Sequence, residues 1–260
     1  MSQINAPDGT PLVYDAYEPA RADIALLLLH DWHPQGGDMS AAFREMGNQL
    51  AQAGVAAYFL EQRGHGRSGG TRGHLSRFSQ LLGDLQALRR TVRGRRDIPQ
   101  VLVGYGFGGL VVLRYLETQP GEAPAAAVIA SPWLATRARP AVWKRLAARL
   151  ADLWPTLPTG RGDAFMTAGA RAELQWARRA VLADCQRIER PVLLVLGGAD
   201  RITDTEVARR FAGDLGTRAT VQWYPELPYD LLARPDVRAP LLRFIAAYRV
   251  AAPAGPGPLS

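Results

Sequence analysis

The chain has 260 residues, of which 47% are hydrophobic and 21% charged, which suits one domain with a sizeable core and excludes disorder over most of its length. Its single cysteine, Cys185, excludes an internal disulfide and a cysteine-based zinc site. The net charge of +7 comes from arginines that are spread along the chain, with Lys144 as the one lysine, so we do not expect nucleic-acid binding. The sequence has neither a signal-peptide pattern nor a membrane-spanning apolar run, and we expect a cytoplasmic protein.

Short apolar segments alternate with amphipathic ones along the chain. Residues 8–18 are predicted to form an antiparallel hairpin at a sheet edge, with Asp8-Gly9 as its turn. Buried strands are predicted over Ile24–His30, Ala56–Glu61, Gln100–Gly104, Ala125–Ser131, Val192–Gly197 and Thr220–Tyr224. Helices are predicted between and after them, over Ser40–Ala53, Phe78–Val92, Phe107–Glu117, Thr205–Leu215 and Val237–Val250. This alternation predicts an α/β fold, in which helices flank a mostly parallel central sheet.

The segment 132–183 is too long for an ordinary connection between two strands. It holds four of the six tryptophans, Trp133, Trp143, Trp154 and Trp176. Apolar residues at helical spacing over Ala141–Trp154 predict a helix, and we do not expect it to contact a membrane. The prediction is therefore a core over 1–131 and 184–250, a short helical cap over 132–183, and a disordered Pro/Gly/Ala-rich tail over 251–260.

A glycine-rich turn follows the strand predicted at Gln100–Gly104. Gly104-Tyr105-Gly106-Phe107-Gly108-Gly109 matches the dinucleotide-binding pattern G-x-G-x-x-G. However, several strands precede this one, and the next strand ends in Ser131-Pro132 instead of an acid that would bind a ribose. We therefore expect no nucleotide cofactor. The second interpretation is a nucleophile elbow, G-x-S-x-G, with Gly106 in the serine position.

A series of motifs favours the second interpretation. They are Leu27–His30, the run Arg63-Gly64-His65-Gly66-Arg67-Ser68, the run Leu196-Gly197-Gly198-Ala199-Asp200, and Tyr224-Pro225. In this order they resemble the monoacylglycerol lipase/lysophospholipase (serine aminopeptidase S33-like) branch of the α/β-hydrolases. The resemblance covers roughly residues 8–250, and it implies the α/β-hydrolase fold.

The resemblance also implies a catalytic triad in the order Ser, Asp, His. The three positions fall on Gly106, Asp200 and Tyr229. All four histidines, His30, His33, His65 and His74, precede residue 75, so none can serve as the triad histidine. Glycine cannot form an acyl-enzyme, and a tyrosine is a poor general base at neutral pH. Ser68, Ser76 and Ser131 are not expected to replace the missing nucleophile.

Part of such a site would survive these replacements. The backbone N–H groups of Trp32 and Phe107 would form the oxyanion hole. Asp31 and His33 add ionisable groups to the same loop, either as a replacement acid and base or as parts of a solvated loop. Tyr229 could bond Asp200 or donate to a substrate oxygen, and Asp200 could instead cap the following helix.

The remaining predictions concern two aromatic residues and the function. Tyr105 is expected to pack beside the turn, and Trp133 to contact a ligand. The first functional hypothesis is a lyase, cyclase or isomerase acting on an apolar carbonyl compound, with Tyr229, Asp200 or His33 moving protons. The alternatives are a catalytically dead protein that binds a hydrophobic ligand or a protein, and a residual ester hydrolase. No cofactor and no metal are expected, and the oligomeric state stays open.

Overall fold

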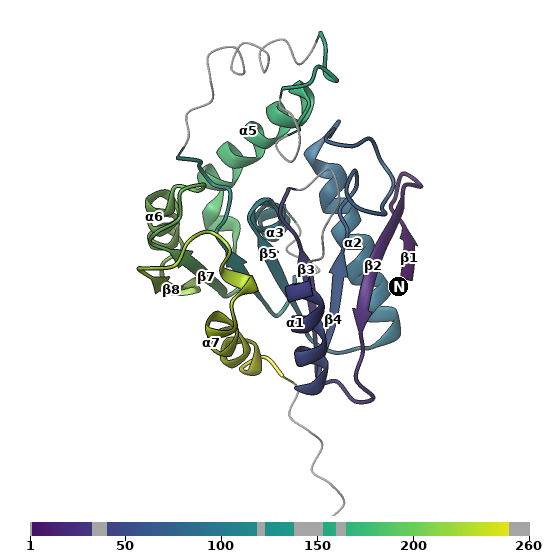
Figure 1. Cartoon of the computed structure of the whole chain (residues 1–260), viewed down its shortest axis with the longest axis vertical. Coiled ribbons are helices and arrows are strands. Elements are labelled where there is room, and N and C mark those ends of the chain that lie inside the picture. Colours follow the sequence, from purple (N-terminus) through teal and green to yellow (C-terminus); the bar gives the residue numbers. More distant parts are fainter. Residues whose placement is uncertain (1, 33–40, 119–122, 138–152, 160–164, 250–260) are drawn as a thin grey trace, which may run out of the picture.

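The computed structural model describes residues 2–32, 41–118, 123–137, 153–159 and 165–249 (Figure 1). Eight strands of these residues form one sheet in the order β1-β2-β4-β3-β5-β6-β7-β8. They are β1 (Ser2–Asn5), β2 (Pro11–Tyr17), β3 (Ile24–Leu29), β4 (Val55–Leu60), β5 (Gln100–Tyr105), β6 (Ala126–Ala130), β7 (Val192–Gly197) and β8 (Ala219–Tyr224). The pairs β1/β2 and β2/β4 are antiparallel and the other neighbouring strands are parallel, which confirms the predicted mostly parallel sheet.

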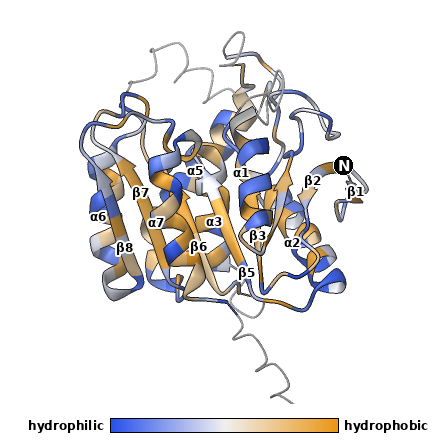
Figure 2. Cartoon of the chain, turned by 60° about the horizontal axis from the view of Figure 1, so that its bottom comes forward, coloured by the Kyte–Doolittle hydropathy of each residue, from blue (hydrophilic) through white to orange (hydrophobic). Residues whose placement is uncertain are grey.

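Helices cover both faces of this sheet. The described helices are α1 (Ala41–Gln52), α2 (Phe78–Arg95), α3 (Phe107–Thr118), α5 (Ala168–Ala183), α6 (Thr205–Leu215) and α7 (Pro235–Ala246). Helices α2, α3, α5 and α6 pack into one apolar cluster, and α1 and α7 pack into a second cluster on the opposite face. The strands between them are hydrophobic along most of their length (Figure 2). None of the described helices is long and apolar enough to cross a membrane.

Strand β3 illustrates why the central strands are apolar throughout. Ala25, Leu27 and Leu29 face one cluster, whereas Ile24, Leu26 and Leu28 face the other. Because successive side chains point to opposite faces, a strand covered on both faces needs hydrophobic residues at every position.

The predicted hairpin at the sheet edge is present, but its boundaries differ from the prediction. Its first strand is β1, which precedes Asp8-Gly9, so 8–18 holds only the turn and the second strand. Gly9 has a φ of 82°, and the Asp8 carboxylate accepts a hydrogen bond from the Thr10 N–H at 3.1 Å. The turn residues were therefore predicted correctly, whereas the first strand was placed too late because Gln3 and Asn5 give it little apolar character.

Helix α5 was not predicted as a separate element. It begins after Thr167, whose hydroxyl caps it by accepting from the Ala170 N–H. Its buried residues are Ala168, Ala170, Leu174, Ala177 and Val181, and all but Ala168 join the cluster that includes α3. The division of the chain into core, cap and tail stays a prediction, because 138–152, 160–164 and the tail lie outside the described residues.

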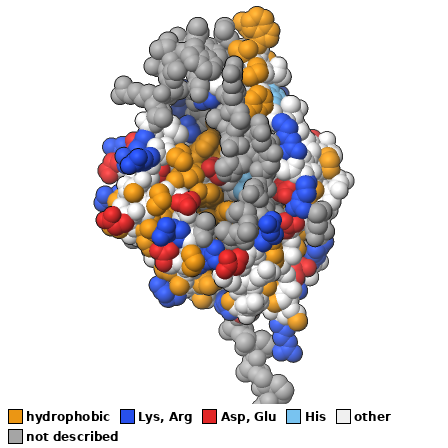
Figure 3. All heavy atoms as spheres, viewed as in Figure 1, with side chains coloured by type: hydrophobic (Ala, Val, Ile, Leu, Met, Phe, Trp, Pro, Cys, Tyr) orange, Lys and Arg blue, Asp and Glu red, His pale blue; other side chains and the backbone are white. Residues whose placement is uncertain are grey.

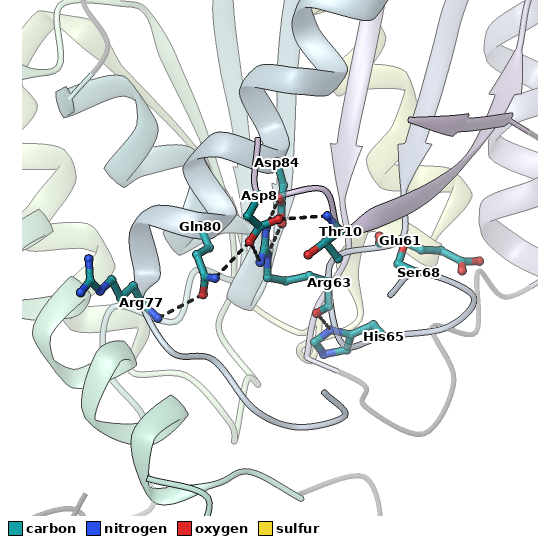
Figure 4. A network of polar contacts seen from close by, with 9 residues as sticks. All are labelled: Asp8, Thr10, Glu61, Arg63, His65, Ser68, Arg77, Gln80 and Asp84. Atoms are coloured by element: carbon teal, nitrogen blue, oxygen red, sulfur yellow. Dashed lines mark hydrogen bonds and ion pairs between the residues drawn. The ribbon is translucent and has the colours of Figure 1, made fainter. Parts of the chain in front are cut away.

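The Arg63 loop is tied to two other parts of the fold (Figure 4). The Arg63 guanidinium donates to both carboxylate oxygens of buried Asp84 on α2, at 2.6 and 2.5 Å, and to Asp8 at 2.7 Å. Paired hydrogen bonds of this kind are strong because both partners are charged. Glu61 holds the same loop by accepting from the Arg67 backbone N–H and from its guanidinium at 2.8 Å. The run that carries the family resemblance is thus a structural loop here.

Glu117 on α3 predicts a pH dependence of stability. Its side chain is buried, and burial outweighs the ion pair with Arg114 at 2.8 Å and raises the pKa of Glu117 to about 7. Because the pKa is higher in the folded state, protonation of Glu117 contributes to the free energy of unfolding. This contribution is fully present below the unfolded pKa, near 4.5, and is lost as the pH rises through about 7. Glu117→Gln should therefore gain about 2–3 kcal/mol relative to the unsubstituted protein between pH 5 and pH 8. Urea unfolding at both pH values measures this, and a pH-independent difference would contradict it.

Candidate active site

The turn between β5 and α3 is built around Gly106. This residue has a φ of 56°, which glycine adopts without strain. Its N–H donates to the Ala130 carbonyl at 3.0 Å, and its carbonyl accepts from the Trp133 N–H at 3.1 Å. A Cβ atom at this position would lie 2.0 Å from the Tyr229 hydroxyl oxygen and 2.3 Å from Asp31 Oδ1. The space next to Gly106 is therefore filled by two polar side chains from distant parts of the sequence.

A second glycine of the turn has a packing reason. A Cβ atom on Gly108 would lie 2.3 Å from the Leu29 carbonyl oxygen, so the start of α3 approaches β3 too closely for any side chain. The close packing of helix α3 on the sheet thus explains why this position is glycine, and nucleotide binding is not needed to explain it.

Asp31 provides the carboxylate beside Gly106. It follows β3 and is 4% exposed, so the hypothesis of a solvated loop is wrong for this residue. Asp31 Oδ1 accepts a hydrogen bond from the Phe107 N–H at 2.7 Å, and Oδ2 accepts from the Tyr229 hydroxyl at 2.5 Å. The residue before Asp31 is also fixed, because the His30 ring accepts a hydrogen bond from the Gln62 backbone N–H and the His30 carbonyl accepts one from the Gln62 side-chain amide. The carboxylate is thus fixed by a backbone donor and a phenol.

Tyr229 reaches Asp31 from the segment between β8 and α7. Its hydroxyl also accepts a hydrogen bond from the Trp133 indole N–H at 2.9 Å, and its carbonyl accepts from the Ser131 hydroxyl at 2.8 Å. Burial raises the pKa of Tyr229 well above its ordinary value, and the negative charge of Asp31 raises it further. The phenol therefore stays protonated at physiological pH and acts as a donor.

The predicted contact between Tyr229 and Asp200 is not formed. Asp200 is 1% exposed, and its carboxylate accepts from the backbone N–H groups of Ile202 and Thr203 and from the Thr203 hydroxyl. These three donors belong to the turn before α6, so Asp200 orders this turn and does not bond the phenol. The other role that the sequence left open, the cap of the following helix, is also not observed, because the N-cap of α6 is Asp204, whose side chain accepts from the Glu206 and Val207 N–H groups.

The expected oxyanion hole is occupied by protein. The Phe107 N–H points at Asp31 Oδ1 instead of an open niche. The Trp32 side chain is buried, stands edge-on to the Phe107 ring at 5.0 Å, and donates its indole N–H to the Phe165 carbonyl at 3.0 Å. A substrate oxygen can therefore use the Phe107 N–H only if Asp31 moves away.

The other predicted residues are placed as follows. Tyr105 is buried and packs on the Tyr229 ring with centroids 5.1 Å apart, which agrees with a packing role. Burial raises the pKa of Tyr105, and the charge of Asp31 adds to this. Trp133 bonds Tyr229 directly. His33 lies outside the described residues.

None of the three serines considered from the sequence stands in a nucleophile's place. The Ser131 hydroxyl donates to the Tyr229 carbonyl, and the Ser68 hydroxyl donates to the Glu61 carbonyl. Ser76 lies 3.1 Å from a ring nitrogen of His74, but it is exposed and the other ring nitrogen meets the Thr167 hydroxyl instead of a carboxylate. These contacts are structural.

Sequence reasoning missed two features near the site. Ser131 adopts a φ of 45°, which is unusual for a residue with a side chain, and its hydroxyl fixes the backbone of Tyr229. Arg178 on α5 donates to the Trp133 carbonyl at 2.7 Å. The periodicity of α5 could have indicated Arg178, whereas no sequence signal indicates the conformation of Ser131.

The fold and the position of the turn after β5 define an α/β-hydrolase. The chain belongs to the family described as serine aminopeptidase, S33, whose model matches residues 34–176, more than half of the chain. The expected branch of α/β-hydrolases, of the lipase and esterase type, agrees with this family and with the relatives below.

Two curated relatives match part of the chain. A monoacylglycerol lipase of Mycolicibacterium smegmatis is 30% identical over 44% of this chain and 40% of its own length. An uncharacterized abhydrolase domain-containing protein of Dictyostelium discoideum is 32% identical over 37% of this chain and 10% of its own length. The matches thus span less than half of either relative.

Solved structures match nearly the whole chain. The monoacylglycerol lipase of Paleococcus ferrophilus has a TM-score of 0.77 at 21% identity, covering 91% of this chain and 99% of that protein. A soluble variant of the Saccharomyces cerevisiae monoglyceride lipase, bound to a substrate analog, has a TM-score of 0.80 at 16% identity, covering 96% of both chains. At these identities the likeness shows the fold.

Proposed function

We propose that this protein is a non-hydrolytic member of its family, a lyase, cyclase or isomerase that moves a proton on a small carbonyl compound. The observation that carries the proposal is the Asp31 carboxylate, held by the Phe107 N–H and the Tyr229 hydroxyl, in the space next to Gly106. The serine and histidine positions of the family are occupied by Gly106 and Tyr229, so the residues that would form and resolve an acyl-enzyme are missing.

The proposed chemistry uses Asp31 as the base and Tyr229 as the donor. Asp31 takes a proton from a carbon next to the substrate carbonyl, and the electrons of the broken C–H bond move into an enolate. The Tyr229 hydroxyl turns from Asp31 Oδ2 to the carbonyl oxygen and stabilises its developing negative charge. Return of the proton from Asp31 to another carbon gives an isomer, whereas departure of a leaving group gives an elimination product.

This assignment revises the roles expected from sequence. Asp200 takes no part, because its carboxylate is satisfied by the turn before α6. Tyr229 keeps the donor role, supported by the raised pKa of its phenol. The partner is a small molecule that is at least partly apolar, because the site is bordered by the aromatic rings of Tyr105, Phe107 and Trp133.

Exchange of substrate protons with heavy water tests the proposal without knowledge of the natural substrate. The protein is incubated in D₂O with a panel of ketones, lactones and thioesters, and loss of the proton signal next to the carbonyl is followed by NMR. We expect catalysed exchange in at least one compound class, which Tyr229→Phe slows strongly because the enolate oxygen loses its donor. Hydrolysis of an ester in the panel with no exchange in any compound would contradict the proposal.

A binding protein without catalysis is the second candidate. It is favoured by the hydrogen bonds within the site, since Asp31 accepts from both the Phe107 N–H and the Tyr229 hydroxyl. Tight binding of a panel compound with no proton exchange, unchanged by Asp200→Asn, would favour this candidate over the enzyme.

A further inference from the structure

Two arginines on α5 have no carboxylate partner in the described part of the chain. Arg171 and Arg178 are seven residues apart, about two helical turns, so they lie on the same side of the helix. Arg178 donates through Nε to the Trp133 carbonyl at 2.7 Å, and Arg171 donates through Nε to the Thr159 hydroxyl at 3.1 Å. Each guanidinium thus meets one neutral oxygen, and its other donors meet no carboxylate among the described residues.

The lack of an anion has an energetic cost, because both side chains are partly buried. Burial lowers the pKa of Arg178 to about 10, and the positive charge of Arg171 contributes to this decrease. Burial also lowers the pKa of Arg171. Buried charges in proteins are normally paired, as Arg63 is with Asp84. Two neighbouring cations without such pairing destabilise the fold unless a bound anion offsets them.

The pair lies next to the proposed acid–base residues. The Arg178 guanidinium carbon is 5.6 Å from the centre of the Trp133 ring, and the Trp133 indole N–H donates to the Tyr229 hydroxyl. Tyr229 in turn donates to Asp31. Helix α5 packs on α3, the helix that begins directly after Gly106 (Figure 1). A molecule that reaches Tyr229 is therefore within reach of Arg178, and Arg171 continues the basic face along α5.

On these grounds we propose that Arg178 and Arg171 bind an anionic group, a carboxylate or a phosphate, of the molecule that reaches Asp31 and Tyr229. Guanidinium groups bind both anions through paired hydrogen bonds, which a neutral ester or alcohol cannot match. This inference rests on the proposed function for the site that it serves, and it names the class of substrate. The substrate would be an anionic carbonyl compound, whereas a neutral glyceride would leave both cations uncompensated.

The space-filling view shows an apolar surface that suits the body of such a ligand. Hydrophobic side chains gather on the face shown, beside the atoms drawn in grey, and both basic and acidic side chains lie near them (Figure 3). The preference for an anionic group therefore rests on the two arginines of α5.

Calorimetric binding of three probes with the same chain tests the proposal. The probes are hexanoate, hexyl phosphate and the neutral hexanamide. We expect at least one anion to bind about tenfold or more tightly than the amide. Arg178→Gln and Arg171→Gln should each reduce this preference, and the double variant should abolish it. Arg179→Gln is the matched control, because Arg179 is exposed on the same helix, and it should keep the preference.

Three results would overturn the proposal: equal affinity for anions and amide, no measurable binding of either anion, or a preference that survives in the double variant. Arg178→Lys, which keeps the charge but loses the paired hydrogen bonds, guards against a folding defect and should retain part of the preference. Failure of the proposed function alone would appear as anion preference without proton exchange. Failure of the anion site alone would appear as proton exchange without anion preference.

Discussion

Asp31→Asn is expected to slow proton exchange by about 10²- to 10⁴-fold, the usual contribution of a positioned general base. An amide at this position cannot accept the proton, and its single oxygen can accept from only one of the two present donors, because an NH₂ group replaces the other oxygen. The fold should survive with some loss of stability, since the amide oxygen can keep the Phe107 N–H while the NH₂ group donates to the Tyr229 hydroxyl oxygen. NMR in D₂O, with the compound that the unsubstituted protein exchanges fastest, measures the effect.

Asp200→Asn is the matched control for this result. Asp200 is a second buried aspartate close to the ends of the parallel strands, but its carboxylate bonds only its own turn. We expect this variant to lose some stability and to keep proton exchange in its folded fraction. Exchange that survives in Asp31→Asn and disappears in Asp200→Asn would show that the base was assigned to the wrong residue.

Gly106→Ser is expected to destabilise the protein by about 2–5 kcal/mol without creating a serine hydrolase. The new Cβ would lie 2.0 Å from the Tyr229 oxygen and 2.3 Å from Asp31 Oδ1, and overpacking of this kind costs about 1–3 kcal/mol. The left-handed backbone costs a further ~1–2 kcal/mol for any residue with a side chain. Thermal unfolding should show a decrease in Tm of roughly 4–20 °C.

Two glycines separate these contributions. Gly9 has a positive φ of 82° and open space around it, so Gly9→Ala measures the backbone cost alone. Gly94 on α2 has neither a positive φ nor a close neighbour, and Gly94→Ala should be neutral or stabilising by up to ~1 kcal/mol. Equal Tm values for Gly106→Ser and Gly9→Ala would mean that Asp31 and Tyr229 do not fill the space beside residue 106.

Much of the fold could be predicted because its signals are local. The central strands are apolar at every position and their predicted ends differ by at most a residue or two from β3 to β8. Helix α5 was missed although Ala170, Leu174, Ala177 and Val181 have helical spacing. The tryptophans of the segment 132–183 favoured the prediction of a cap. The buried face of α5 consists mostly of alanines, which give only a weak hydrophobic periodicity in the sequence.

The site was only partly predictable, because its contacts join residues far apart in the sequence. The resemblance to a family placed Gly106 and Tyr229 at two triad positions, and it placed Asp31 in the loop that was expected to form the oxyanion hole. The contact between Asp31 and Tyr229 spans 198 positions, and no pattern in the sequence indicates it. The same holds for Arg178, whose contact with the Trp133 carbonyl joins residues 45 positions apart.

Covalent labelling with a serine-directed fluorophosphonate tests whether an acyl-enzyme can form at the turn after β5. Intact-mass spectrometry compares the purified, folded protein with a monoacylglycerol lipase treated in parallel as a positive control. We expect full labelling of the lipase and no adduct on this protein. A stoichiometric adduct on any serine of this protein, reduced by a competing ester, would contradict this expectation.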